Sequence, residues 1–314
     1  MSDNAHAEER PHVPVLPDEV ISGLAVKPGG TYIDSTFGRG GHFSQIAKRL
    51  TDGRILGIDR DREAIEYAKR HFPGGNTRVV HGRFSQIAEL AAENGISCAD
   101  GILLDAGVSS PQFDDSSRGF TFRTSGTLDM RMDTADSLTA KEIVNTYSKE
   151  RLVAIFRDYG EERFAVRIAD AIIRRRERAE LETTEELSEL IKAAYPAKFR
   201  RDKHPAKKVF MAIRYEVNSE VQELTKFLET APGLLKKGGR LAVISFNSIE
   251  DRLVKTSYSR LADGCVCPKN RPCVCGFVQK YRTVGKVITA GRDELLQNPR
   301  SAPAKLRILE RIAD

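Results

Sequence analysis

The chain has 314 residues, of which 40% are hydrophobic and 30% are charged, a composition typical of a soluble globular protein. Its formal net charge of +6 allows a polyanionic partner but does not establish one. Its apolar runs are shorter than the roughly 18 residues of a transmembrane helix, and residues 1–10 lack the apolar centre of a secretory signal. We therefore expect a cytoplasmic protein with no membrane partner, whose residues 1–10 form a disordered lead-in.

A strand, a glycine turn and a helix follow one another near the start of the chain. After a short helix from Leu16 to Leu24, the apolar run Thr31–Asp34 predicts a strand, and the turn after it contains Gly40 and Gly41. The spacing of apolar residues predicts a helix that begins at His42. This arrangement is typical of a nucleotide-binding unit, because glycines let the backbone approach a ligand and the helix N-terminus offers N–H groups.

Three further strands are predicted in the first third of the chain, at Arg54–Asp59, Thr77–His81 and Ala99–Asp105. A helix from Arg62 to His71 and a short helix capped by Ser85 separate them. Strands that alternate with helices predict a parallel, doubly wound α/β sheet. Asp59 lies about twenty residues after the glycines, where such folds place an acid on a ribose hydroxyl. The ligand is therefore expected to contain adenosine, which leaves NAD and S-adenosylmethionine as alternatives.

The pattern changes after the fourth strand. No strand is predicted from about Val108 to Pro205: Ser109–Asp136 is expected to be loop, and helical periodicity follows it, with Ser137 and Thr183 as expected N-caps. Four helices are predicted there: Ser137–Tyr147, Lys149–Tyr159, Glu161–Arg176 and Thr183–Tyr195. The sheet then resumes with a helix and three strands: Val209–Thr230, Arg240–Phe246, Val284–Thr289 and Ala304–Ile312. We expect a discontinuous α/β domain, 11–107 and 209–314, interrupted by a helical insertion, 108–208.

Candidate ligand contacts gather where the strands end. Phe84 follows the third strand and is suited to stacking on adenine, although ordinary core packing explains it nearly as well. Asp105 ends a very apolar strand and is suited to accept from an adenine amine or an ammonium group. The loop 108–133 mixes phenylalanines with arginines, which predicts either a clamp for a splayed-out base or a loop that packs its own rings. The basic tract Lys198–Lys208 is typical of phosphate contacts.

Four of the five cysteines form one cluster, Cys265, Cys267, Cys273 and Cys275, whereas Cys98 stands beside a predicted strand. In a cytosolic chain such a cluster favours metal or reduced thiols over disulfides. The C-x-C spacing differs from the usual zinc pattern, so a zinc site and a reduced surface loop both stay open. We assign no metal ligand to the ligand site.

Several strings carry a specific resemblance: STFGRGGH, GIDRD, LLDAGVSSPQFD, LDMRMD, HPAKKVF, SFNSIEDR and NPRSAPAKLR. The chain resembles the bacterial 16S ribosomal RNA cytosine-N4 methyltransferase family from about His12 to Arg311. The resemblance implies a Rossmann-like methyltransferase sheet interrupted by a helical substrate-recognition domain. It also implies S-adenosylmethionine as cofactor, the N4 amine of a decoding-centre cytosine as methyl acceptor, and 16S rRNA in the small ribosomal subunit as partner. By motif, the implied cofactor contacts are Gly40, Gly41, His42, Asp59, Phe84, Asp105 and Gln112.

The resemblance has two departures, Ala106 where the family usually has Leu and Asn247 where it usually has His. An amide can hold a substrate by hydrogen bonds but cannot act as a general base. Positioning is the main requirement for methylating a weakly nucleophilic amine, so we expect Ser110 and Asn247 as catalytic groups that accept or orient the amine hydrogens. Three alternatives remain: methylation of another nucleic acid, a nucleotide-dependent oxidoreductase, and a non-catalytic RNA assembly factor with a cofactor pocket.

Overall fold

A seven-stranded sheet forms the frame of the protein. The computed structural model describes residues 14–199, 204–265, 267, 270 and 274–314. The strand order is β3-β2-β1-β4-β5-β7-β6, in which β1 to β5 are parallel and β7 runs antiparallel to both of its neighbours. The strands are β1 (Thr31–Asp34), β2 (Arg54–Asp59), β3 (Thr77–His81), β4 (Ala99–Asp105), β5 (Leu235–Ser245), β6 (Tyr281–Thr283) and β7 (Lys305–Arg311). The predicted Rossmann-like α/β fold is thereby confirmed.

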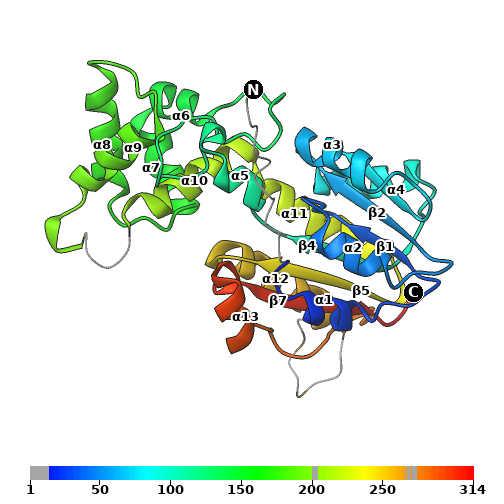
Figure 1. Cartoon of the computed structure of the whole chain (residues 1–314). Helices are drawn as coiled ribbons and strands as arrows, with labels where there is room; N and C mark the ends of the chain where they lie inside the picture. Colours follow the sequence, from blue (N-terminus) through cyan, green and yellow to red (C-terminus); the bar gives the residue numbers. More distant parts are fainter. Residues whose placement is uncertain (1–13, 200–203, 266, 268–269, 271–273) are drawn as a thin grey trace, which may run out of the picture.

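Helices cover both faces of this sheet (Figure 1). One face packs against α1 (Pro17–Leu24), α2 (Gly41–Ala47) and α3 (Arg62–His71). The other packs against α4 (Ile87–Glu93), α11 (Glu220–Thr230) and α12 (Ser248–Ala262). Strand β5 shows why its sequence is continuously apolar: Leu241 and Val243 enter one core, whereas Ala242 and Ile244 enter the other.

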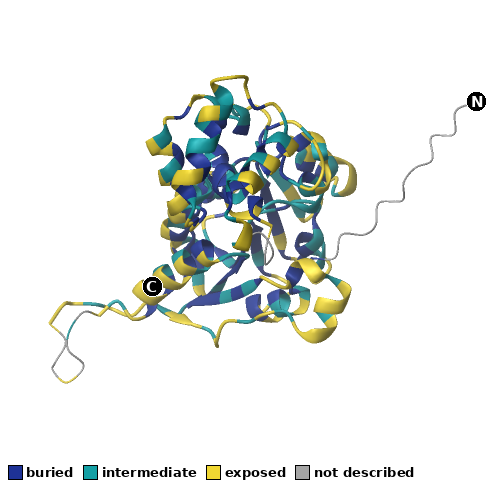
Figure 2. Cartoon of the chain, turned by 90° about the vertical axis from the view of Figure 1, so that its left-hand side faces the viewer, coloured by how far each residue is buried: buried dark blue, intermediate teal, exposed yellow. Residues whose placement is uncertain are grey.

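A separate group of helices lies beside the sheet (Figure 1). It consists of α6 (Ala140–Thr146), α7 (Lys149–Asp158), α8 (Ala165–Arg176), α9 (Thr184–Ala194) and α10 (Ala206–Asn218). These helices share one hydrophobic core, distinct from the two cores of the sheet. In Figure 2 the exposed residues lie on the outer faces of the helices and in loops, and the buried residues lie in the interior. Within the described residues, no helix is both long and apolar enough to cross a membrane.

One long predicted helix is in fact two. The helix expected from Val209 to Thr230 breaks at Ser219, which has a left-handed φ of 52° and separates α10 from α11. Because the buried side chains of α10 enter the helical core, the domain boundary expected at Lys208 falls inside this helix. The division into domains otherwise stays a prediction.

Other differences are smaller. Thr139, rather than Ser137, caps α6, and its hydroxyl accepts from the Glu142 N–H. Ser85 lies inside a 3₁₀ turn, η1 (Phe84–Gln86), instead of capping the next helix. Thr183 caps α9 as predicted, with the reciprocal Glu186 contact of a capping box. The strand predicted at Val284–Thr289 is wrong: in this segment Ile288 makes only an isolated bridge, to Leu306. Strand β6 comes earlier in the chain, and α13 (Arg292–Gln297) follows. The expected lead-in, residues 1–10, lies outside the described residues.

A polar joint fixes the helical group to the sheet. The Asn218 side chain donates to the Met130 carbonyl at 2.7 Å and accepts from the Met132 N–H at 2.8 Å. Arg60, directly after β2, donates to the Asn218 carbonyl at 2.9 Å and to Asp136 at 2.7 Å. These buried contacts hold the long loop after β4 between the two parts of the molecule.

Candidate functional site

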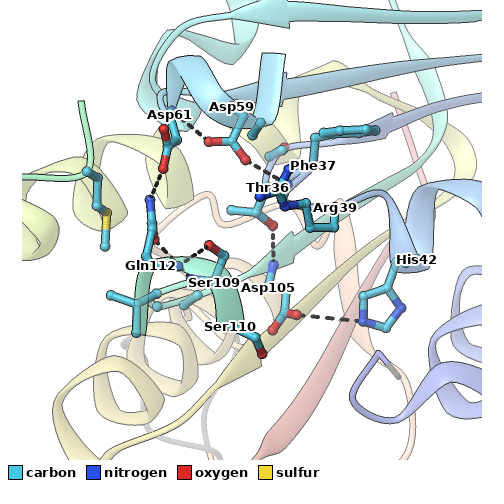
Figure 3. Close-up of a pocket in the computed structure, with 18 of the residues that line it drawn as sticks. Thr36, Phe37, Arg39, His42, Asp59, Asp61, Asp105, Ser109, Ser110 and Gln112 are labelled. Carbon is cyan, nitrogen blue, oxygen red and sulfur yellow. Dashed lines mark hydrogen bonds and ion pairs between the residues drawn. The ribbon is translucent and has the colours of Figure 1, made fainter. Parts of the chain in front are cut away.

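A cavity of about 1080 Å³ lies at the carboxyl ends of β1, β2 and β4. Such edges are the usual ligand sites of parallel α/β sheets. Gly40, Gly41, His42, Asp59, Phe84, Asp105, Ser110 and Gln112 all line it. The structure thus brings together every predicted ligand residue except Asn247, and Figure 3 shows most of them around the same space.

The glycine turn after β1 forms one wall. Gly38 and Gly40 have positive φ values, 55° and 73°, which side chains rarely adopt. A Cβ at Gly40 would also lie 2.9 Å from the Phe72 ring, so the turn and the aromatic packing beneath it require glycine there. His42 lies in the first turn of α2, only 7% exposed.

Asp59 is held by the backbone on both sides. One carboxylate oxygen accepts from the Gly38 N–H at 2.7 Å and the other from the Asp61 N–H at 2.8 Å. Burial raises the pKa of Asp59 from 3.8 to about 6, although these two N–H groups act in the opposite direction. The carboxylate therefore joins the β1 turn to the end of β2 and keeps free lone pairs at the cavity wall.

Asp105 is the least satisfied carboxylate of the cavity. Its backbone N–H donates to the Thr36 hydroxyl at 2.8 Å, and one carboxylate oxygen lies 3.7 Å from His42 Nε2 (Figure 3). The other oxygen, Oδ1, is buried and has no hydrogen-bond partner in the described part of the chain. Burial, reinforced by the charge of Glu250, raises the pKa of Asp105 to about 7. A buried acceptor without a donor is costly, and a bound cation or amine would remove that cost.

Asp61 holds the loop after β4 against the sheet. Its carboxylate accepts from Gln112 Nε2 at 2.6 Å and from Arg118 at 3.2 Å. The Gln112 amide oxygen in turn accepts from the Ser109 N–H, and the Ser109 hydroxyl caps α5 (Ser110–Asp114). Gln112 thus lines the cavity and also fixes the turn that presents Ser110 (Figure 3).

The loop 108–133 packs most of its own predicted stacking groups. Phe120 is buried in the helical core, Arg118 is buried beside Asp61, and Arg131 makes two hydrogen bonds with Asp129. Phe120 and Arg118 are therefore packed inside the protein, as the self-packing alternative expects, and the base clamp otherwise stays a prediction. Phe122 instead stacks on His204, with ring centroids 4.6 Å apart.

The structure adds a packing contact for Phe84 and a helix-capping role for Asn247. The Phe84 ring packs edge-on against Phe227 of α11 and also lines the cavity, so its core packing leaves the expected stacking on adenine as a prediction. Asn247 caps α12, where its side-chain oxygen accepts from two backbone N–H groups and its amide donates to the Tyr215 hydroxyl. Asn247 is not among the residues that line the cavity, but its three hydrogen-bond partners, Tyr215, Ile249 and Glu250, all line it.

Several lining residues were missed by the sequence analysis. The pKa of Asp34, at the end of β1, is raised well above its usual value, by burial first. Tyr215 and Glu250 come from α10 and α12 and are joined by a short hydrogen bond. The segment around Arg300 adds another wall, where Arg300 pairs with Asp114 of α5 at 2.6 Å. Asp34 carried the same strand-end signal as Asp59, and Arg300 belongs to the string NPRSAPAKLR.

A second cavity, of about 690 Å³, lies on the helical group. Phe122 and His204 line it together with Arg123, Lys207 and Glu189. Within the predicted basic tract, His204 and Lys207 line this cavity, whereas Lys208 donates to the Glu161 carbonyl at 2.7 Å. Residues 200–203 of the tract lie outside the described residues.

Comparison with known proteins identifies the family of this chain. The model of the MraW methylase family matches residues 9–312. The chain belongs to the MraW methylase family. Ribosomal RNA small subunit methyltransferase H of Fusobacterium nucleatum is 48% identical over 308 residues, covering 96% of this chain and 98% of that protein. The protein of the same name from a Geobacter species is 46% identical over 311 residues, covering 97% of this chain and 100% of the relative.

Membership of a methylase family confirms the predicted family and supports S-adenosylmethionine as the cofactor. The cavity fits such a cofactor chemically. A glycine turn allows close approach, Asp59 offers acceptors suited to ribose hydroxyls, and Asp105 has a buried oxygen that requires a donor. Carboxylates at the ends of three strands also suit a ligand that carries positive charge on its sulfur and its amine.

Proposed function

We propose that this MraW methylase family protein transfers a methyl group from S-adenosylmethionine to the N4 amine of a cytosine in the decoding centre of 16S rRNA. The substrate is the small ribosomal subunit or its RNA. Two curated relatives, matched over nearly their full lengths, carry the name ribosomal RNA small subunit methyltransferase H. The observation that carries the proposal most is the Asp105 oxygen, buried without a donor and beside Ser110 in the cavity.

In this proposal the cofactor contacts are the seven residues implied by the family motifs: Gly40, Gly41, His42, Asp59, Phe84, Asp105 and Gln112. All seven line one cavity. Asp59 accepts from the ribose hydroxyls, and Phe84 packs on the adenine. Gln112 acts largely by position, because its amide is already bonded to Asp61 and to the Ser109 N–H. When bound, S-adenosylmethionine supplies an electrophilic methyl group on a positively charged sulfur.

The residues around Ser110 orient the acceptor amine. Cytosine N4 is a weak nucleophile because its lone pair is delocalised into the ring, so accepting one of its hydrogens favours a tetrahedral nitrogen. Ser110, at the start of α5, offers a hydroxyl oxygen in the cavity, and the carboxylate of Asp105 offers a second acceptor nearby. Holding the amine in line at near-attack distance supplies most of the acceleration such a reaction needs.

Asn247 contributes as a positioning residue. Its three hydrogen bonds hold the start of α12 and the Tyr215 hydroxyl, and Tyr215 donates to Glu250 in the cavity wall. In this proposal no proton is transferred at position 247, because an amide cannot act as a general base. The asparagine satisfies the helix terminus, a role in which this residue type is favoured.

The helical group, α6 to α10, together with the loop 108–133 is proposed to bind the RNA around the target base. Tyr215 of α10 and Met132 of the loop line the cofactor cavity, and the second cavity combines the stacked Phe122–His204 pair with Arg123 and Lys207. Aromatic rings and cations in one depression suit an unpaired base and its phosphate.

Transfer of a labelled methyl group tests this function. Purified protein is incubated with labelled S-adenosylmethionine and, separately, small ribosomal subunits, deproteinised 16S rRNA, transfer RNA and duplex DNA. The proposal expects label in the small subunit or its RNA, and nucleoside mass spectrometry should identify N4-methylcytidine. Label in DNA or transfer RNA alone would favour another nucleic-acid substrate. Cofactor and RNA binding without any label would favour the non-catalytic assembly factor.

A further inference from the structure

Three cysteine sulfurs meet in the loop that joins α12 to β6. Cys265, Cys267 and Cys275 each place their sulfur within 4.8 Å of the other two. The described parts of this loop run away from the body of the protein in Figure 2. Cys273 lies outside the described residues.

The distance between two of these sulfurs is too long for a disulfide. Cys275 Sγ lies 3.7 Å from Cys265 Sγ. A disulfide would require about 2.05 Å. Two thiolates that share one tetrahedral zinc ion, with bonds of about 2.3 Å, lie about 3.8 Å apart. The observed spacing excludes a covalent bond; it suits a hydrogen bond between the two thiols and also two thiolates on one metal ion.

The surrounding backbone prepares this geometry. The Val274 N–H donates to Cys267 Sγ at 3.3 Å, the kind of outer contact that stabilises a thiolate beside a metal. Just outside the cysteines, Gly264 lies directly against the Phe277 ring, since a Cβ there would come within 2.7 Å of it. The two arms of the loop are therefore already together at its base.

We propose that Cys265, Cys267 and Cys275 bind a thiophilic divalent cation, in the first place Zn²⁺, in a site that is separate from the cofactor cavity. The three sulfurs supply three corners of a tetrahedron, and each thiol loses its proton as it binds. Val274 and Val278 are 88% and 67% exposed, so burial of apolar side chains does not order this segment. The inferred role of the ion is to hold the loop, and it takes no part in methyl transfer.

Metal content is the direct test. The full chain is purified under reducing conditions, without chelator or metal-affinity resin, incubated with Zn²⁺ and desalted. Elemental analysis should then find about one zinc ion per chain. Cys265→Ser and Cys275→Ser should each lower the affinity by more than the roughly 10- to 100-fold that loss of an outer contact costs. Cys98→Ser is the matched control, because Cys98 lies beside β4, and it should retain full zinc.

A second readout does not depend on folding of the variants. Co²⁺ in place of Zn²⁺ should give the absorption of a thiolate-to-metal charge transfer, and a chelator should abolish it. Chelation should also expose three further thiols to a thiol reagent. Less than about one-tenth of an ion per reduced chain would overturn the proposal, as would zinc that survives in the Cys265→Ser, Cys267→Ser, Cys275→Ser triple variant. Methyl transfer that stays intact in this triple variant would leave the proposed function unaffected.

Discussion

The raised pKa of Asp105 predicts a pH dependence of cofactor affinity. Burial and Glu250 raise this pKa to about 7, so the carboxyl group is protonated below that pH. An ionised carboxylate is the better acceptor for a cationic ligand. About one Asp105 in eleven is ionised at pH 6 and about ten in eleven at pH 8, so affinity should rise about tenfold across this interval. Asp59, with a pKa of about 6, should add about a factor of two.

Asp105→Asn isolates this effect. The substitution keeps the shape and the backbone N–H that bonds to Thr36, but it removes the titrating charge. The variant should bind S-adenosylmethionine more weakly at pH 8 and should show only the factor of about two that Asp59 provides. The amine of the cofactor titrates equally in both experiments and cancels in the comparison.

Titration calorimetry in two buffers of different ionisation enthalpy provides the measurement. At pH 7 the native protein should release about half a proton more than Asp105→Asn when the cofactor binds. S-adenosylhomocysteine, which lacks the sulfonium charge, is a useful second ligand. Equal pH profiles for the native protein and a folded variant would refute the assignment of Asp105 to the charged ligand.

Three further predictions concern the cofactor, the helix cap and the RNA. Asp59→Ala should weaken the binding of S-adenosylmethionine about 10- to 150-fold, because charged hydrogen bonds worth about 1.5–3 kcal/mol are lost. Calorimetry measures this change, and an unchanged affinity would contradict the role of Asp59. Asn247→Ala should lower the free energy of unfolding by about 1 kcal/mol in a denaturant titration, whereas Asn247→Asp should retain the cap; equal loss in both would contradict the cap's importance. Arg123→Ala with Lys207→Ala should weaken RNA binding and reduce its salt slope by about 1.5, unlike Lys237→Ala at the opposite end of the sheet. An unchanged slope would place the RNA elsewhere.

The strands were predictable because their signal is local. Thr77–His81 and Ala99–Asp105 have the predicted bounds, and the run Arg54–Asp59 also begins and ends as expected. Strands buried on both faces need apolar residues throughout, and their carboxyl ends need groups that tolerate an open cavity. This is why acids at the strand ends indicated the site.

The break between α10 and α11 was not predictable in this way. The run from Val209 to Thr230 keeps helical periodicity and contains neither glycine nor proline. The chain nevertheless turns at Ser219, because Asn218 is bound to Met130 and Met132 from a loop more than eighty residues away, and Arg60 holds the Asn218 carbonyl. Contacts distant in sequence determine this left-handed residue, so no local pattern reveals it.

The same tertiary contacts explain how the helical group and the cavity are joined. Tyr215 belongs to α10, whose other buried side chains enter the helical core, yet its hydroxyl bonds to Glu250 and to Asn247 at the start of α12. Glu250 in turn acts on the pKa of Asp105 at the end of β4. A shift of α10 on RNA binding would therefore alter the position of Glu250, and with it the ionisation of Asp105. Withdrawal of Glu250 from Asp105 would favour the ionised Asp105 that binds a cation. If RNA binding causes such a withdrawal, RNA and cofactor would strengthen each other's binding by the same factor.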